Sequence, residues 1–203
     1  MFINDWFMPS VRVAALFGSR AFAFGVTIAL RRQVLAGMGG LAAIANQLAD
    51  DYRLGELTRA RGLRTVLSAV VVETCVDEHS FGGLVRHELR WLRTIRAVRP
   101  LGYGLSIITF SVPMALLGCA ISRAAWPTLV LLAVTALGRT ALHVRVRGAA
   151  KGLARDFAVL PLREALSLLL WAWGFVTRRV QWRDDRLRVT RDGSVQPVVR
   201  ITQ

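Results

Sequence analysis

Two small groups of residues in this chain could do chemistry. Asp50 and Asp51 stand side by side in the stretch LADDYRLG, and the stretch HELRW ends in Arg90 and Trp91. A carboxylate can take a proton from a hydroxyl group within hydrogen-bond reach, and arginine presents a planar fork that matches phosphate oxygens. Both groups also have structural uses, because an aspartate can cap a helix and a tryptophan can anchor one at a membrane interface.

The composition indicates a membrane-associated globular protein. Of the 203 residues, 54% are hydrophobic and the formal net charge is +14, while the mean hydropathy is +0.43. Nearly all of the positive charge is arginine, since Lys151 is the only lysine. Such a charge suits nucleic acid, anionic lipid or a phosphorylated substrate. The long apolar runs argue against nucleic acid, so we expect no nucleic-acid partner.

The elements that must position these residues can be predicted from spacing. Leucines at helical spacing predict a helix around ADDYRLGELTRARG, with Asp50 or Asp51 as its cap and Gly62 at its end. Residues 64 to 76, RTVLSAVVVETCV, are apolar and rich in β-branched side chains, which predicts a buried strand. Together these features favour an α/β first half.

Residues 84 to 99 predict a basic amphipathic helix. Its apolar side chains fall on one broad arc, and the arginines lie opposite or at the border of that arc: Arg86, Arg90, Arg93, Arg96 and Arg99. Long arginine side chains at such a border can reach lipid headgroups. We therefore expect this helix to lie in a membrane interface, with Trp91 as a candidate anchor.

Three apolar segments follow this helix. Residues 101 to 121 are long enough to cross a bilayer, residues 124 to 143 are interrupted by Arg139, and residues 157 to 177 contain Arg163 and Glu164. The basic stretch between the second and third segments predicts a cytoplasmic loop. The arginine-rich tail after the third segment is also predicted to be cytoplasmic. The third segment therefore either spans the membrane, lies at its interface or forms a re-entrant segment. A strand is expected around residues 187 to 190.

In this order, ADDY, the Arg-Trp pair and the apolar segments resemble the ceramide glucosyltransferase family, glycosyltransferase family 21. The likeness is strongest to its bacterial, hopanoid biosynthesis-associated branch, and it extends from INDWFMPS to the tryptophan-arginine tail. The resemblance implies an integral protein of a bacterial inner membrane with its catalytic face in the cytoplasm. The implied reaction is transfer of a sugar, with inversion, from a UDP-sugar donor to a lipid acceptor hydroxyl such as that of ceramide or a hopanoid.

The resemblance also implies an α/β fold, the C-terminal part of a GT-A type nucleotide-sugar domain followed by α-helical membrane segments. We accordingly expect four regions. Residues 1–83 would be the partial GT-A domain and residues 84–99 the interface helix. Residues 100–179 would be the membrane segments and residues 180–203 the cytoplasmic tail.

Site roles follow from the same resemblance. Asp51 matches the catalytic base best, with Asp50 as its neighbour. Arg90 and Trp91 match the end of a substrate-binding motif, and His87 stands where the family has glutamine or arginine. Arg183 is a weaker substrate-binding candidate.

A divalent metal, Mg or Mn, is expected for the complete enzyme, but its Asp-x-Asp motif does not occur in this chain. We therefore expect the donor half from an N-terminal segment or a partner chain. The alternative is a non-catalytic or degenerate subunit that binds membrane lipid through the helix at residues 84 to 99.

Overall fold

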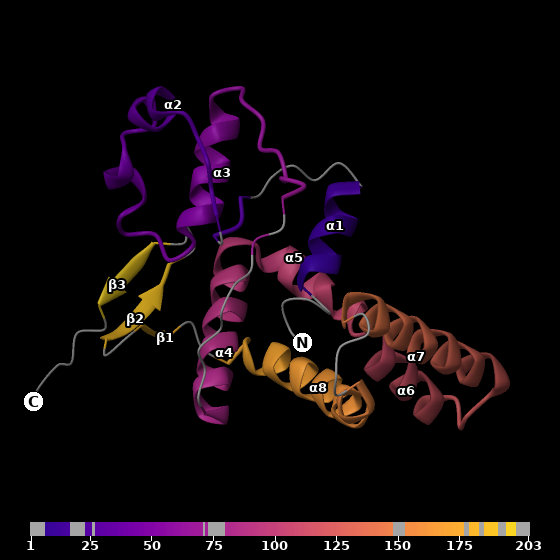
Figure 1. Ribbon diagram of the computed structural model, residues 1–203. Coiled ribbons are helices and arrows are strands. Elements are labelled where there is room, and N and C mark those ends of the chain that lie inside the picture. The colour runs from indigo at the N-terminus through magenta and orange to yellow at the C-terminus, as the bar shows by residue number, and fades with distance from the viewer. Residues whose placement is uncertain are drawn as a thin grey trace, which may run out of the picture. The chain divides into compact units, whose positions relative to one another are not determined.

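The computed structural model describes residues 7–16, 23–25, 27–70, 72, 80–147, 153–176, 179–182, 185–190 and 194–197. The chain divides into two compact units. Unit 1 comprises Met1–Ala14 and Leu101–Trp173, and unit 2 comprises Ala15–Pro100 and Gly174–Gln203. Figure 1 shows the helices and strands of both units.

Unit 2 combines short helices with an antiparallel sheet of order β1-β2-β3. Its elements are α2 (Arg32–Gly37), η2 (Leu41–Ile44), α3 (Asp50–Ala60), α4 (Phe81–Val98), β1 (Arg179–Trp182), β2 (Asp185–Val189) and β3 (Val195–Pro197). Helix α4 packs against β1 and β2 (Figure 1). Ala97, Val180 and Val189 form the apolar cluster between them, with Leu48 and Leu187 packed against it.

The expected α/β fold of GT-A type is wrong for this structure. The described residues are predominantly helical, and their strands all lie between residues 179 and 197. The predicted buried strand is also wrong where it is described, because residues 64–70 and Val72 form no strand. Val66 is 87% exposed and Val70 75% exposed. A buried strand needs a hydrogen-bonded neighbour and covering helices; an apolar, β-branched run supplies neither by itself.

The predicted helix around ADDY is confirmed as α3, with one difference at its start. Ala49 occupies the N-cap position without a side-chain bond, so both aspartates lie in the first helical turn. The predicted end at Gly62 is confirmed: its φ is +71°, a left-handed conformation that glycine adopts without steric cost. Its N–H donates to the Arg59 carbonyl at 2.8 Å, and the Leu63 N–H donates to the Thr58 carbonyl at 3.2 Å.

The predicted basic helix is confirmed as α4, which begins at the cap Ser80, whose hydroxyl accepts from the Gly83 N–H at 3.0 Å. Its buried residues are Glu88, Leu89, Leu92 and Ala97. Glu88, only 3% exposed, was not predicted inside, because carboxylates are rarely buried.

Two arginines of α4 contact other segments of unit 2. The Arg93 Nη1 donates to the Arg179 carbonyl at 2.9 Å. The guanidinium of Arg96 lies 5.8 Å from the centre of the Phe175 ring. These arginines therefore help to hold α4 within its own unit, a use that the amphipathic pattern did not reveal.

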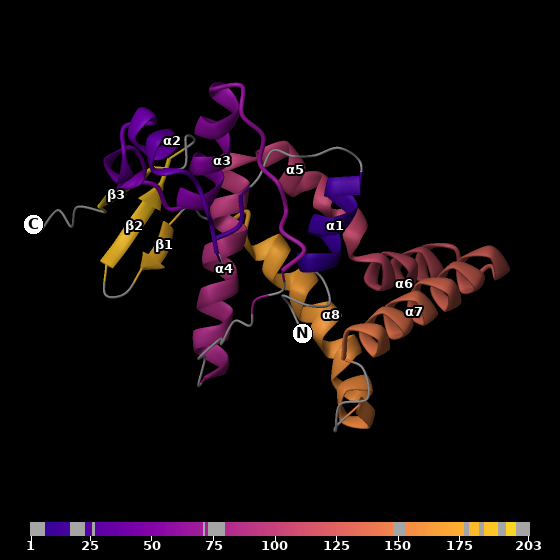
Figure 2. The ribbon, with the colours of Figure 1, turned by 45° about the horizontal axis from the view of Figure 1, so that its top comes forward.

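Unit 1 is helical. It holds α1 (Met8–Leu16), α5 (Pro100–Leu105), η3 (Ser106–Thr109), α6 (Ser111–Ile121), α7 (Trp126–Arg147) and α8 (Leu153–Trp173), with the ends of α1 and α5 at its borders. Helices α6 and α7 run side by side in both views (Figure 1, Figure 2). The turn between them places two residues other than glycine, Arg123 and Ala124, at positive φ.

The first predicted span, residues 101 to 121, is not one straight helix. Pro100–Thr109 and Ser111–Ile121 are bent by 69° at the break between them. Pro113 explains the break, since it has no N–H for the carbonyl of Thr109 and its ring would clash with that carbonyl. Phe110 is accordingly non-helical, with φ −85° and ψ 58°.

The second predicted apolar segment, residues 124 to 143, forms most of one continuous helix, α7. Within the described ranges, one helix is long and apolar enough to cross a membrane, Trp126–Val146, and the bent pair would add a second only if it forms one span. Only 6% of the apolar window of α7 is buried inside the structure. Most of this apolar surface is therefore not covered by other parts of the described structure.

Charged side chains join α7 to α8. Arg139, which interrupts the second apolar segment, forms an ion pair with Glu164 of the third. One turn further along α7, the His143 Nε2 lies 3.5 Å from the Asp156 Oδ2. Glu164 is 5% exposed and His143 is 1% exposed. Arg139 and Glu164, one charge from each apolar segment, are therefore partners across the helix pair.

We predict that Arg139→Met alone lowers the free energy of unfolding by about 3–5 kcal/mol, because it leaves the buried Glu164 charge without its partner. Arg139→Met combined with Glu164→Leu should recover most of this loss, since a matched apolar pair replaces a buried ion pair at little cost. Denaturant titration of the detergent-solubilised protein measures both values.

The matched control is Arg145→Met, on the same helix but exposed; it should change the free energy of unfolding by no more than about 0.5 kcal/mol. A double variant as unstable as Arg139→Met would contradict the assigned pairing.

Candidate functional site

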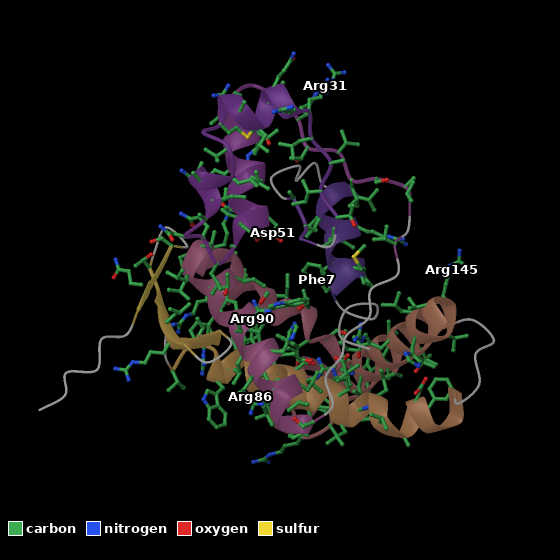
Figure 3. The ribbon with its side chains drawn as sticks, turned by 60° about the vertical axis from the view of Figure 1, so that its left-hand side comes forward. Phe7, Arg31, Asp51, Arg86, Arg90 and Arg145 are labelled. Atoms are coloured by element: carbon green, nitrogen blue, oxygen red, sulfur yellow. The ribbon has the colours of Figure 1, made fainter. Side chains whose placement is uncertain are left out.

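Asp51 lies in the first turn of α3, where backbone amides hold both of its carboxylate oxygens (Figure 3). The Gly25 N–H donates to Oδ2 at 2.9 Å, and the Tyr52 N–H donates to Oδ1 at 2.7 Å. The neighbouring Asp50 turns its Oδ1 toward the Asp51 N–H, at 2.9 Å. The start of a helix suits these acidic groups, because its amide N–H groups carry partial positive charge.

The pKa of Asp51 is raised above its ordinary value. Burial of the carboxylate is the largest cause, and the negative charge of Asp50 adds to it. The hydrogen bonds from the amides of Tyr52 and Gly25 act in the opposite direction, since they stabilise the charged form. The net result is a carboxylate with a stronger affinity for a proton than a solvent-exposed aspartate, which is a property of a general base.

Tyr52 connects this site to the end of α4. The Arg99 Nε donates to the Tyr52 Oη at 2.8 Å, and its guanidinium carbon lies 5.6 Å from the centre of the tyrosine ring. Tyr52 thus contributes its backbone amide to Asp51 and its side chain to α4. Neither Tyr52 nor Arg99 was among the predicted site residues.

The other predicted residues of the Arg-Trp motif lie on α4. The rings of His87 and Trp91 meet edge to face, with centroids 4.9 Å apart at 61°. Arg90 is half-buried, and its carbonyl accepts a hydrogen bond from the Thr94 hydroxyl at 2.8 Å. Arg99 comes nine residues after Arg90, which corresponds to roughly 14 Å along the helix axis. Figure 3 shows Asp51 on α3 and Arg90 on α4, both in unit 2.

Arg183, the weaker candidate, lies outside the described residues. It falls between β1 and β2, where Trp182 and Asp185 are register partners.

The described residues do not fit a divalent metal. No group of three or more histidine, cysteine, aspartate or glutamate side chains gathers among them. Both oxygens of Asp51 already accept amide N–H groups, and the sequence has no Asp-x-Asp motif. The described residues therefore offer no ligand set for a cation.

The family comparison bears on the whole chain. The model of Glycosyl transferase family 21 matches residues 1–195. The chain belongs to this family. Membership makes it a glycosyltransferase with a nucleotide-sugar donor and an acceptor, and it confirms the family indicated by ADDY and the Arg-Trp pair. No curated protein and no solved structure gave a match.

We predict that Asp50→Asn lowers the pKa of Asp51, because it removes a like charge and keeps the oxygen that accepts from the Asp51 N–H. Titration of ¹³C-labelled aspartate carboxyls by NMR measures this pKa, with the signal assigned through Asp51→Asn. Glu56→Gln, on the same helix, is the control and should leave the pKa of Asp51 in place. An unchanged pKa in Asp50→Asn would contradict the coupling.

The same variant should change the pH dependence of stability. A raised pKa means that the folded protein binds the proton of Asp51 more tightly than the unfolded chain does. That contribution to stability is complete below the unfolded-state pKa and is lost as the pH rises through the folded-state pKa. Asp50→Asn should therefore reduce the loss in free energy of unfolding as the pH rises from the unfolded-state pKa to the folded-state pKa of Asp51.

Proposed function

We propose that this glycosyltransferase transfers a sugar, with inversion, from a UDP-sugar to the hydroxyl group of a membrane lipid, such as ceramide or a hopanoid. The observation that carries the proposal is the geometry of Asp51: a carboxylate with a raised pKa, held on both oxygens at the start of α3.

In the proposed reaction, Asp51 is the general base. The acceptor hydroxyl gives its proton to the Asp51 carboxylate while its oxygen forms a bond to the anomeric carbon of the donor. The bond from that carbon to the UDP oxygen breaks on the opposite face, and UDP leaves with the electron pair. A single displacement of this kind inverts the anomeric centre, and the proton then passes from Asp51 to solvent.

The residues on α4 are proposed to bind the substrates. The guanidinium of Arg90 would offset the charge that develops on the leaving diphosphate. The contact between His87 and Trp91 restricts the tryptophan ring, which would pack against donor or acceptor. A divalent metal, Mg or Mn, stays a prediction for this reaction, since the described residues offer no ligand set for it.

The lipid nature of the acceptor is supported by unit 1. Large apolar side chains on α6 and α7 are more than half exposed, among them Leu116, Ile121, Trp126, Val134 and Leu137. Such a surface is costly in water and favourable in a bilayer. We propose a bacterial inner membrane, with unit 2 on the cytoplasmic face, where UDP-sugars are made.

We predict that Asp51→Asn lowers the rate of sugar transfer by about 10²–10⁴-fold, the usual contribution of a general base. The measurement is incorporation of radiolabelled sugar from UDP-sugars into lipid, in membranes that contain the enzyme. Glu56→Gln is the control and should retain activity and membrane insertion. Near-normal turnover in Asp51→Asn would exclude this aspartate as the base.

The second candidate function is a non-catalytic subunit that binds anionic lipid through α4, favoured by the exposed Arg86 and the net charge of +14. It predicts vesicle binding that weakens with salt and no affinity for UDP-sugars. UDP-sugar binding by the purified protein, measured by calorimetry, would exclude this candidate.

A further inference from the structure

Gly25 approaches the Asp51 carboxylate so closely that a side chain at this position would press against it. Its N–H donates to Oδ2 at 2.9 Å. A Cβ atom built at Gly25 would lie 3.3 Å from Oδ2 and 3.6 Å from Cγ of Asp51. Contacts of 3.3 Å are tighter than most real Cβ contacts, so the carboxylate would have to move by a few tenths of an ångström.

The backbone conformation of Gly25 does not itself demand glycine. The described glycines with positive φ are Gly39, Gly40 and Gly62, and Gly25 is not among them. Outside the left-handed region, glycine also allows the backbone to approach a functional group more closely than a residue with a Cβ atom could. At Gly25 that group is the carboxylate of Asp51.

The opposite side of the carboxylate is held by Tyr52, whose N–H donates to Oδ1 at 2.7 Å. The tyrosine is held in turn by the hydrogen bond from Arg99, at 2.8 Å. Each carboxylate oxygen therefore accepts one hydrogen bond from a backbone amide. Each oxygen also keeps a second lone pair that can accept from a substrate hydroxyl.

We propose that Gly25 is a positioning residue for Asp51, with Tyr52 and Arg99 fixing the other side of the same carboxylate. The significance for the reaction rests on the proposed function, in which Asp51 is the base. The positioning itself rests on the contacts alone.

This arrangement acts on the chemical step. A general base must meet the acceptor hydroxyl in a narrow range of positions, and a misplacement of about 1 Å can cost 10²-fold in rate. A shift of a few tenths of an ångström should cost roughly 10-fold. Donor affinity should hardly change, because the acceptor proton, and not the diphosphate, meets Asp51.

The deciding variant is Gly25→Ala, which adds the Cβ atom. Its matched control is Gly82→Ala on α4, where a Cβ would meet only the end of the flexible Arg86 side chain, at 3.4 Å. We expect Gly25→Ala to lower kcat roughly 10-fold, with KM for the UDP-sugar within about 2-fold of the original. Gly82→Ala should change neither constant.

A second readout needs no transferase activity. In NMR titration of the purified protein with ¹³C-labelled aspartate, Gly25→Ala should raise the pKa of Asp51. The reason is that the hydrogen bond from the N–H of residue 25, which stabilises the charged carboxylate, becomes weaker. If this shift appears while the original protein transfers no sugar, the proposed function fails and the positioning role stands.

If Gly25→Ala does not fold, as judged by circular dichroism, the variant Tyr52→Phe tests the same proposal. It removes the hydroxyl that accepts from Arg99 and leaves the Tyr52 amide in place. We expect a smaller fall in kcat, a few-fold, and a displaced carboxyl signal of Asp51. A carboxyl signal and a kcat that both stay unchanged in every folded variant would overturn the proposal.

Discussion

The arrangement of the candidate site depends on one small apolar cluster, formed by Ala97 of α4 with Val180 and Val189 of the C-terminal hairpin. Leu48, just before α3, packs against the same cluster, so the segment that leads to Asp51 and the end of α4 share one core. Backbone contacts support this junction, since the Val195 N–H donates to the Asn46 carbonyl at 2.9 Å. The tail of the chain is therefore part of the scaffold that brings Tyr52 to Arg99.

Charge inside apolar elements is a second theme of the structure. In unit 1, Arg139 and Glu164 interrupt two apolar helices, and each supplies the partner that the other needs. A charge in a poorly solvated place is costly unless it is paired, so such a pair fixes which faces of α7 and α8 meet. In unit 2, burial also disfavours the charged form of Asp51, and it thereby raises the pKa of the carboxylate.

Sequence predicted the elements whose signals are local. Helical spacing found α3 and α4, the glycine at the end of α3 was assigned correctly, and the apolar length of α7 was evident. Elements that need distant partners were not predictable in this way. The apolar run after residue 63 has the composition of a buried strand, but its described residues, 64–70 and Val72, form no strand. The break at Phe110 follows from Pro113, which the prediction of one span from a long apolar run did not take into account. Gly25 is 26 residues from Asp51, and no local pattern joins them.

The measurement that tests the central claim most directly is the anomeric configuration of the product, determined by NMR of the glycolipid formed from a UDP-sugar. When Asp51 activates the acceptor hydroxyl for attack on the face opposite UDP, the reaction is a single displacement, so we predict a configuration inverted relative to the donor. A product that retains the donor configuration would exclude a single displacement from the face opposite UDP, and it would contradict the role assigned to Asp51.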